Sequence, residues 1–263
     1  MSSADDIGKK RKTMEEDDQE DGGIYQNTIL NRNIDSKLEH ESARLSSQKA
    51  VLHSRKKVTF LLEQASLELV KIDRNWEILN GDEHQQYMKR KNLNPADYRP
   101  DIVHQCVLSL LDSPLNKAGY LDLYIHTTSN ALIKVNPQTR IPRTLKRFCG
   151  LMVQLLQDLK IFGHGVSKPL LQVIRNPITD HLPGICWKTV CSYNCENLKS
   201  PYSHGQEVIK KDIDILYVVG AMAHGKIVEE WADEELKISS FPLSASAVCH
   251  RICSAYETLY EVL

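Results

Sequence analysis

The most chemically suggestive stretch of this sequence is a run of basic residues from Lys134 to Arg147. It contains five lysine and arginine side chains and no acidic one. A helix is predicted to begin at Pro142, because the missing N–H of proline costs nothing in a first turn. Arg143 and Arg147 then share one helical face, and Arg140 lies just before the helix. Guanidinium groups fixed on a rigid element suit phosphate binding. The run therefore predicts an anion or nucleic-acid site, with a solvated helix face as the alternative.

A second candidate site is the sequence Arg99-Pro100-Asp101, which precedes another predicted helix. Pro100 favours an extended conformation at Arg99. Asp101 can serve as the N-cap of a helix that begins near Ile102, with His104 at the third position of a capping box. The carboxylate of Asp101 can also pair with Arg99 and hold its guanidinium. Both roles of Asp101 remain open at this point.

Two glycines near the C-terminus follow a predicted strand over residues 214–219. Gly220 directly follows that strand and Gly225 comes five residues later. Glycine allows a ligand to approach the backbone closely, although a tight turn is the commoner explanation. The segment is not a Walker A loop, because Lys226 is followed by Ile227 and not by serine or threonine.

A further segment rich in small residues covers 238–247. It contains the end of a predicted strand, a turn with Pro242 and the start of a helix, for which Ser244 can be the N-cap. The small residues would let a cofactor or another backbone approach closely. Core packing is the alternative explanation.

The seven cysteines favour buried, reduced thiols over disulfides or zinc ligands. Their number is odd, and residues 1–12 lack the apolar segment of a secretory signal. Cys186, Cys191 and Cys195 lack the duplicated close pairs of zinc knuckles. The sequence therefore predicts no metal site.

These segments lie among short strands that alternate with amphipathic helices. Strands are predicted over 57–63, 121–126, 131–135, 170–174, 187–190, 214–219 and 236–239. Helices are predicted over 103–112, 142–160 and 244–263. This alternation is typical of an α/β fold with a mostly parallel sheet that is flanked by helices.

The N-terminal segment differs from the rest in composition. Residues 1–57 hold 22 charged side chains and a single aromatic residue, Tyr25. Such a segment buries too little apolar surface to fold. We therefore expect a disordered charged tail over 1–56, with a short helix around 35–45, and a folded domain over 57–263. The tetrad Lys9–Lys12 is either a nuclear-import signal or a solvated charge run.

The whole chain is close to neutral. Its 263 residues include 33 basic and 34 acidic side chains. This balance argues against a polybasic protein that binds nucleic acid by bulk charge, although it permits a local basic patch. No apolar run approaches the roughly 18 residues of a membrane span. We therefore expect no membrane partner.

Seven segments together resemble a known family of RNA-modifying enzymes. They cover residues 62–67, 99–105, 111–116, 135–143, 147–156, 219–226 and 241–245. In sequence and order they are similar to the essential nucleolar N1-specific pseudouridine methyltransferases of small-subunit ribosome biogenesis. This family belongs to the SPOUT, or α/β-knot, class. The resemblance extends over residues 57–263.

The resemblance implies a trefoil-knotted α/β fold and a homodimer with C2 symmetry. It implies S-adenosyl-L-methionine as methyl donor and N1 of a pseudouridine in 18S-type small-subunit rRNA as acceptor. It also implies a role in 40S ribosome biogenesis in the nucleus and nucleolus, on pre-rRNA and with other assembly factors. The implied cofactor-binding residues are Cys191, Gly220, Gly225, Lys226, Ile227, Ile238, Ser239, Ser240, Phe241, Pro242 and Leu243.

The resemblance also assigns roles to the basic residues. It implies RNA binding by Arg99, Arg140, Arg143 and Arg147. Asp101 and Arg99 form the implied catalytic pair, in which Asp101 either accepts the N1 proton or only steadies Arg99. Two other functions stay open: a knotted dimer that serves pre-rRNA assembly as a non-catalytic scaffold, and a nucleotide-binding module unrelated to RNA.

Overall fold

The computed structural model describes residues 56–165, 167–227 and 229–262. Residues 1–55 of the predicted tail, with the short helix around 35–45 and the tetrad Lys9–Lys12, lie outside this range. Among the described residues we find no helix with the length and apolar content of a membrane span.

A single eight-stranded sheet runs through the described domain, and its first five strands in spatial order are parallel. These are β10 (Glu234–Leu236), β8 (Cys186–Cys191), β9 (Asp214–Gly220), β1 (Val58–Ala65) and β4 (Leu121–Thr127). β1 lies between β9 and β4, and nearly all of it is buried. Strands buried on both faces have continuous apolar runs, which explains why the sequence predicts this strand so directly.

Three further strands continue the sheet in antiparallel fashion. They are β5 (Leu132–Val135), β7 (Pro169–Ile174) and β6 (Lys160–Phe162), in this order from β4. β4 and β5 are joined by residues 128–131, a connection too short for a parallel crossover. The expected α/β fold with a mostly parallel sheet is therefore confirmed, with an antiparallel extension at one edge.

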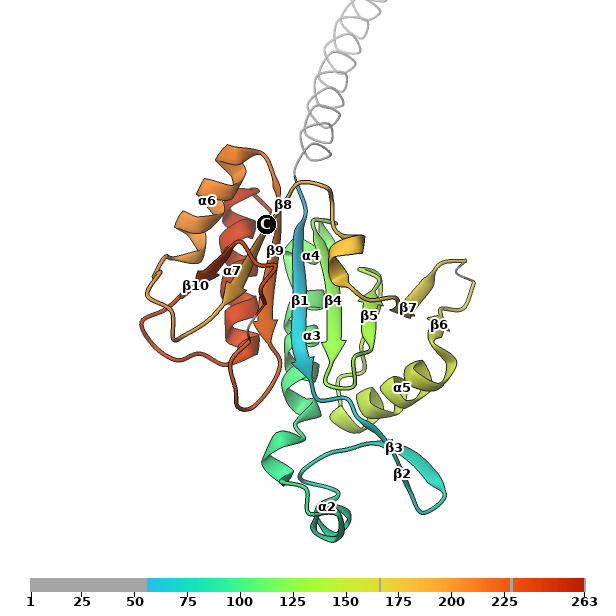
Figure 1. Ribbon diagram of the computed structural model, residues 1–263. Helices are drawn as coiled ribbons and strands as arrows, with labels where there is room; N and C mark the ends of the chain where they lie inside the picture. Colours follow the sequence, from blue (N-terminus) through green and yellow to red (C-terminus); the bar gives the residue numbers. More distant parts are fainter. Residues whose placement is uncertain (1–55, 166, 228, 263) are drawn as a thin grey trace, which may run out of the picture. The chain divides into compact units, whose positions relative to one another are not determined.

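Helices cover the sheet. Figure 1 shows α3 (Pro100–Asp112) and α7 (Ala245–Leu259) behind the central strands, and the two helices pack against each other. The short η2 (Ile178–His181) lies on the opposite face, where Ile178 packs with Leu61 and Tyr124. The remaining helices are α2 (Gln85–Lys91), η1 (Pro95–Asp97), α4 (Pro114–Lys117), α5 (Leu145–Asp158) and α6 (Pro201–Lys211). A two-stranded hairpin of β2 (Leu69–Ile72) and β3 (Asn75–Ile78) stands apart from the main sheet.

Most predicted strands are found within two residues of their expected bounds, but the last one is shifted. It was expected over 236–239 and instead covers Glu234–Leu236. The predicted N-cap Ser244 is confirmed, because its Oγ accepts a hydrogen bond from the N–H of Ala247 at 3.3 Å. α6 was missed, although Ser200 caps it and Pro201 occupies its first position.

A buried chain of polar groups joins α6, β9, β10 and α7. His204 is fully buried, and its Nδ1 lies 2.7 Å from the hydroxyl of Tyr217, which is 3.2 Å from that of Tyr256. The Nε2–H of His204 donates to Glu234 over 2.7 Å. Burial is the largest single influence on the pKa of Glu234 and raises it, but the hydrogen bonds from His204 and Thr189, together with nearby positive charge, outweigh burial and lower that pKa overall. This chain fixes β10 against the rest of the sheet.

We expect Tyr217→Phe to lower the free energy of unfolding by about 1–2 kcal/mol. The hydroxyl of Tyr217 contacts His204 and Tyr256, and each of these buried polar groups would lose a hydrogen-bond partner. Urea denaturation measures this change. The matched control is Tyr202→Phe on α6, where the tyrosine is 44% exposed and little change is expected. Equal losses in both variants would contradict a structural role of the buried chain.

Candidate active site

A cleft with a volume of about 590 Å³ lies at the carboxyl ends of β8, β9 and β10. Cys191, Gly220 and Leu236, the last residues of these three strands, all line it. Ligands of open α/β sheets bind at the carboxyl ends of parallel strands. The volume is in the range of small-molecule sites. The position and the size of the cleft therefore both indicate a ligand site.

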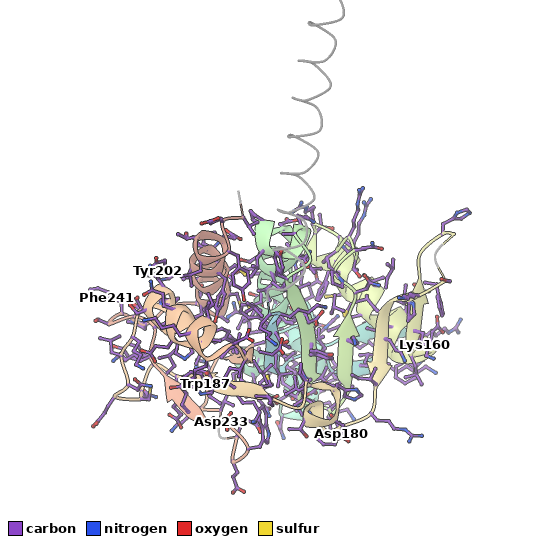
Figure 2. The ribbon with its side chains drawn as sticks, turned by 90° about the horizontal axis from the view of Figure 1, so that it is seen from above. Lys160, Asp180, Trp187, Tyr202, Asp233 and Phe241 are labelled. Atoms are coloured by element: carbon purple, nitrogen blue, oxygen red, sulfur yellow. The ribbon has the colours of Figure 1, made fainter. Side chains whose placement is uncertain are left out.

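The cleft brings together, from three separate segments, most of the cofactor-binding residues that the family resemblance implies. Nine of the eleven predicted residues line it, and Ser240 and Pro242 do not. Phe241 lies at the rim and is 74% exposed, and Figure 2 shows it at the outer edge of the domain, on the side opposite Lys160. The nine lining residues are Cys191, Gly220, Gly225, Lys226, Ile227, Ile238, Ser239, Phe241 and Leu243.

Other lining residues were not predicted. Many lie in the loops that follow β8 and β9 and at the start of α7, and Ala96, Ile102 and Gln105 come from η1 and α3. Proximity to a strand end was a signal that could have found the first two groups. Examples are Ser192, Tyr193, Asn194, Met222, His224, Ser246 and Val248.

Two glycines keep the cleft open. A Cβ atom on Gly220 would lie 3.2 Å from Cδ1 of Ile227 and 3.4 Å from Cε of Met222, which also line the cleft. Gly225 has a φ of +120°, which side-chain-bearing residues rarely adopt. Gly225 therefore requires glycine for its backbone conformation, whereas a side chain at Gly220 would crowd the side-chain ends of Ile227 and Met222.

Two candidate nucleophiles of the cleft, Cys191 and Lys226, are poorly suited to covalent catalysis. Desolvation raises the pKa of the Cys191 thiol to about 12, so it is a neutral thiol near pH 7 and not a nucleophilic thiolate. The ammonium of Lys226 pairs with Glu235 of β10 at 3.1 Å, and both side chains are partly exposed. This pair connects the loop after β9 to the edge strand.

Arg99 and Asp101 line another part of the same cleft. The Nε and Nη2 atoms of Arg99 donate to Oδ1 and Oδ2 of Asp101 at 2.7 and 2.6 Å, which confirms the predicted pair. The hydrogen bond from Arg99 is the main reason why the pKa of Asp101 is lowered. The arginine is thereby held in a bidentate fork.

The predicted capping roles at this helix are wrong. α3 begins at Pro100, two residues earlier than expected, and Arg99 occupies the N-cap position. Asp101 therefore lies inside the first turn, and its carboxylate binds Arg99. His104 forms no capping box, because its Nε2 donates to the carbonyl oxygen of Pro142 at 2.8 Å.

The arginine run differs from its predicted geometry. α5 begins at Leu145, because the carbonyl of Thr144 accepts the first helical hydrogen bond, from Phe148. Arg143 therefore lies before the helix and does not share a helical face with Arg147. Its guanidinium also pairs with Asp112 at the end of α3. That carboxylate is 31 residues away in sequence, so a search for neighbouring acids could not find it.

The cleft does not include Arg140, Arg143 or Arg147, all of which are exposed. Arg99 is therefore the predicted RNA-binding residue that contributes to the cleft wall. The guanidinium groups of Arg140, Arg143 and Arg147 lie on the surface outside the cleft.

A buried carboxylate lies beside the cleft strands. Glu63 of β1 is 2% exposed, pairs in register with Gly220 and accepts the N–H of Ala221 at its carbonyl oxygen. Its carboxylate lies 2.7 Å from Nδ1 of His126, whose Nε2 lies 2.9 Å from Asn130. The hydrogen bond with Glu63 is the largest cause of a raised pKa at His126.

This raised pKa predicts a pH-dependent contribution to stability. The His126–Glu63 pair should stabilise the fold fully below the unfolded-state pKa of about 6.5 and lose that effect as the pH rises through the higher folded-state pKa. The difference in unfolding free energy between the wild type and His126→Gln should therefore be larger at pH 6 than at pH 9. Denaturant titrations at both pH values measure it. His250→Gln, at an exposed position of α7, is the control, and an equal pH dependence there would contradict the assignment.

A mostly parallel sheet, a cleft at the carboxyl ends of its strands and a fixed arginine at the cleft wall define an α/β domain that binds a small molecule. The chain belongs to the EMG1/NEP1 methyltransferase family, whose model matches residues 60–257. This match confirms the resemblance drawn from the sequence motifs.

Relatives and a solved structure agree with this assignment. The proteins named ribosomal RNA small subunit methyltransferase NEP1 of Mus musculus and Homo sapiens are each 44% identical over 208 residues, which is 79% of this chain and 84% of theirs. That of Drosophila melanogaster is 45% identical over 223 residues, 81% of this chain and 87% of its own. The crystal structure of Archaeoglobus fulgidus Nep1 bound to S-adenosylhomocysteine has a TM-score of 0.64 and 26% identity, and the match covers 78% of this chain and 99% of that one.

Proposed function

We propose that this protein is an S-adenosyl-L-methionine-dependent methyltransferase of small-subunit rRNA, with N1 of a pseudouridine as the acceptor. The observation that carries the proposal is the cleft at the carboxyl ends of β8, β9 and β10. Its family and the names of its relatives support rRNA methylation. The S-adenosylhomocysteine in the archaeal neighbour supports the cofactor.

The residues of the cleft fit such a cofactor. S-adenosylmethionine supplies an activated methyl group on a sulfonium centre. Gly220 leaves room for it, and Gly225 holds the backbone of the adjoining loop in its unusual conformation. We assign adenosyl and methionyl contacts to the loops after β8, β9 and β10. The neutral Cys191 thiol and the paired Lys226 would add no unbalanced charge to the cleft when the cationic cofactor is bound.

The RNA side of the proposal rests on the arginines. An enzyme that modifies a base must take it out of its stack, which costs least in single-stranded loops. Arg99 sits at the cleft wall, where it can bind a phosphate next to the everted pseudouridine. Arg140 and Arg147 are exposed and can bind flanking phosphates, and Arg143 can do so when it leaves Asp112.

The geometry favours a positioning role for Asp101 over proton abstraction. Both of its oxygens accept hydrogen bonds from Arg99, and its pKa is lowered. A carboxylate in this state is a weak proton acceptor. We therefore assign most of the rate enhancement to the alignment of N1 with the methyl group, and solvent can take the N1 proton.

A methyl-transfer assay tests this function. Purified protein is incubated with isotope-labelled S-adenosylmethionine and a short rRNA stem-loop that contains either pseudouridine or uridine at the target position. We expect label only in the pseudouridine RNA and N1-methylpseudouridine by mass spectrometry. RNA binding without detectable S-adenosylmethionine binding would instead support the scaffold function. Retention of the methyl group in rRNA from cells that lack the protein would contradict the proposal.

The proposal also covers the topology of the chain, its oligomeric state and its location in the cell. We propose a trefoil knot, and the strand order β10-β8-β9, in which the chain returns past β8 after β9, supports it. We also propose a homodimer and a nucleolar role in 40S biogenesis with other assembly factors. Sedimentation of the purified protein tests the dimer, and fluorescence microscopy of a tagged chain tests the location.

A further inference from the structure

His104 connects two parts of the molecule that carry the arginines. It lies on α3, one turn after Asp101 and five residues after Arg99. Its side chain is 5% exposed, and its Nε2 lies 2.8 Å from the carbonyl oxygen of Pro142. Because a carbonyl oxygen can only accept, the imidazole donates its Nε2–H in this hydrogen bond. The contact joins positions 38 residues apart in sequence.

The acceptor lies in the middle of the arginine segment, which we define as residues 136–144. Pro142 stands between Arg140 and Arg143 in a stretch without regular secondary structure. The backbone of such a stretch is positioned by its individual hydrogen bonds. Asn116 donates to the carbonyl of Pro137 at 3.0 Å, and the hydroxyl of Thr139 donates to Leu170 at 2.8 Å. These bonds hold the first half of the segment, and the second half is held from α3 by His104, which binds its backbone, and by Asp112, which binds the side chain of Arg143.

The ring of His104 makes a second contact on the far side of the arginine segment. It stacks on Phe148 with a centroid distance of 4.6 Å and an interplanar angle of 24°. Phe148 is fully buried in the first turn of α5 and directly follows Arg147. One side chain thus contacts both the segment between Arg140 and Arg143 and the helix turn that carries Arg147.

We propose that His104 is a positioning residue for RNA binding, which sets the arginine segment at a fixed distance from the Arg99–Asp101 pair. The inference rests on the proposed binding of RNA by these arginines. Phosphates along an RNA strand have fixed spacings, so cations on two separate elements bind one strand well only when the elements are held in register. The hydrogen bond to Pro142 supplies this register from α3.

Two substitutions distinguish the contribution of the Nε2–H hydrogen bond to Pro142 from that of the ring stacked on Phe148. His104→Phe keeps an aromatic ring against Phe148 and removes the N–H donor, whereas His104→Gln keeps an amide N–H near the position of Nε2. We expect His104→Phe to weaken binding of the target stem-loop about tenfold and to reduce the salt slope of binding by about one. His104→Gln should stay within about threefold of the wild type. S-adenosylmethionine affinity, measured by calorimetry, should be unchanged in both.

A double-mutant cycle separates positioning from a general structural role. If His104 positions Arg140, then Arg140→Ala should cost less RNA affinity in the His104→Phe background than in the wild type. Additive losses would overturn the inference, as would unchanged RNA affinity in His104→Phe. If His104→Phe does not fold, His104→Asn replaces it, because its shorter amide cannot reach Pro142. Equal RNA affinities of the asparagine and glutamine variants would then overturn the inference.

The wild-type measurement distinguishes this inference from the proposed function. A wild type that binds and methylates RNA, together with a His104→Phe variant that binds equally well, would refute the inference alone. A wild type that does not bind the stem-loop would refute the proposed function and with it the role of His104.

Discussion

Asp101→Asn should lower RNA affinity and methyl transfer together, by about 10- to 100-fold. The carboxylate holds Arg99 through two hydrogen bonds of 2.7 and 2.6 Å at the wall of the cleft. An amide offers only one acceptor oxygen and no charge, so the guanidinium is no longer fixed in a fork. On the proposed mechanism, we expect the arginine to bind an RNA phosphate less well and the everted base to be less well aligned with the methyl group.

Asp112→Asn is the matched control for this experiment. Asp112 is also an arginine-bound carboxylate on α3, but it pairs with Arg143 at a more exposed site. Exposed ion pairs contribute little to stability, and the release of Arg143 adds a free cation. We therefore expect equal or tighter RNA binding in the control, measured by fluorescence anisotropy beside single-turnover methylation. Normal RNA affinity with lost turnover in Asp101→Asn would contradict the positioning role and favour Asp101 as the base.

A second large effect is expected at the cofactor cleft. Gly220→Val should reduce S-adenosylmethionine affinity at least about 100-fold. Its Cβ alone would lie 3.2 Å from Cδ1 of Ile227, and the two methyl groups beyond it would narrow the cleft in which we propose that the cofactor binds. Gly220 is a better probe than Gly225, because its φ does not lie in the left-handed region and a side chain causes no backbone strain there.

Calorimetric titration with S-adenosylmethionine and S-adenosylhomocysteine measures this effect, and thermal unfolding checks the fold. Gly184→Val serves as the control, since a Cβ at Gly184 meets no atom within 4 Å and the residue does not line the cleft. RNA affinity should persist in both variants, because the arginines lie on other elements. Unchanged cofactor affinity in Gly220→Val would place the cofactor elsewhere.

The sequence predicts the buried strands and the local motifs well, for physical reasons. β1 and β9 are buried on both faces, so their apolar runs are continuous and stand out. The hairpin of β2 and β3 was missed because its strands are short and half-exposed, with no strong alternation of apolar residues. α6 was missed because its buried face includes His204 and Gly205, which do not mark an apolar stripe.

The candidate site was predictable where its residues are neighbours in sequence. The Arg99–Asp101 pair spans two positions, and the glycines lie at the end of a clear strand. The contacts that set the geometry of the arginine segment join distant positions, such as Asp112 with Arg143 and His104 with Pro142. No single-sequence pattern encodes such contacts, because they depend on how α3 packs beside the start of α5.

The mixed direction of the sheet has a consequence for how such proteins can diversify. The cleft lies at the ends of the parallel strands β8, β9 and β10, whereas the arginine segment follows β5 in the antiparallel part. If the proposed RNA-binding role of the arginines holds, substitutions around β5 and the start of α5 can retune the target while the cleft stays intact. α3 contributes Arg99 to the cleft and His104 to the arginine segment, so a segment grafted between β5 and α5 must keep its contact with His104.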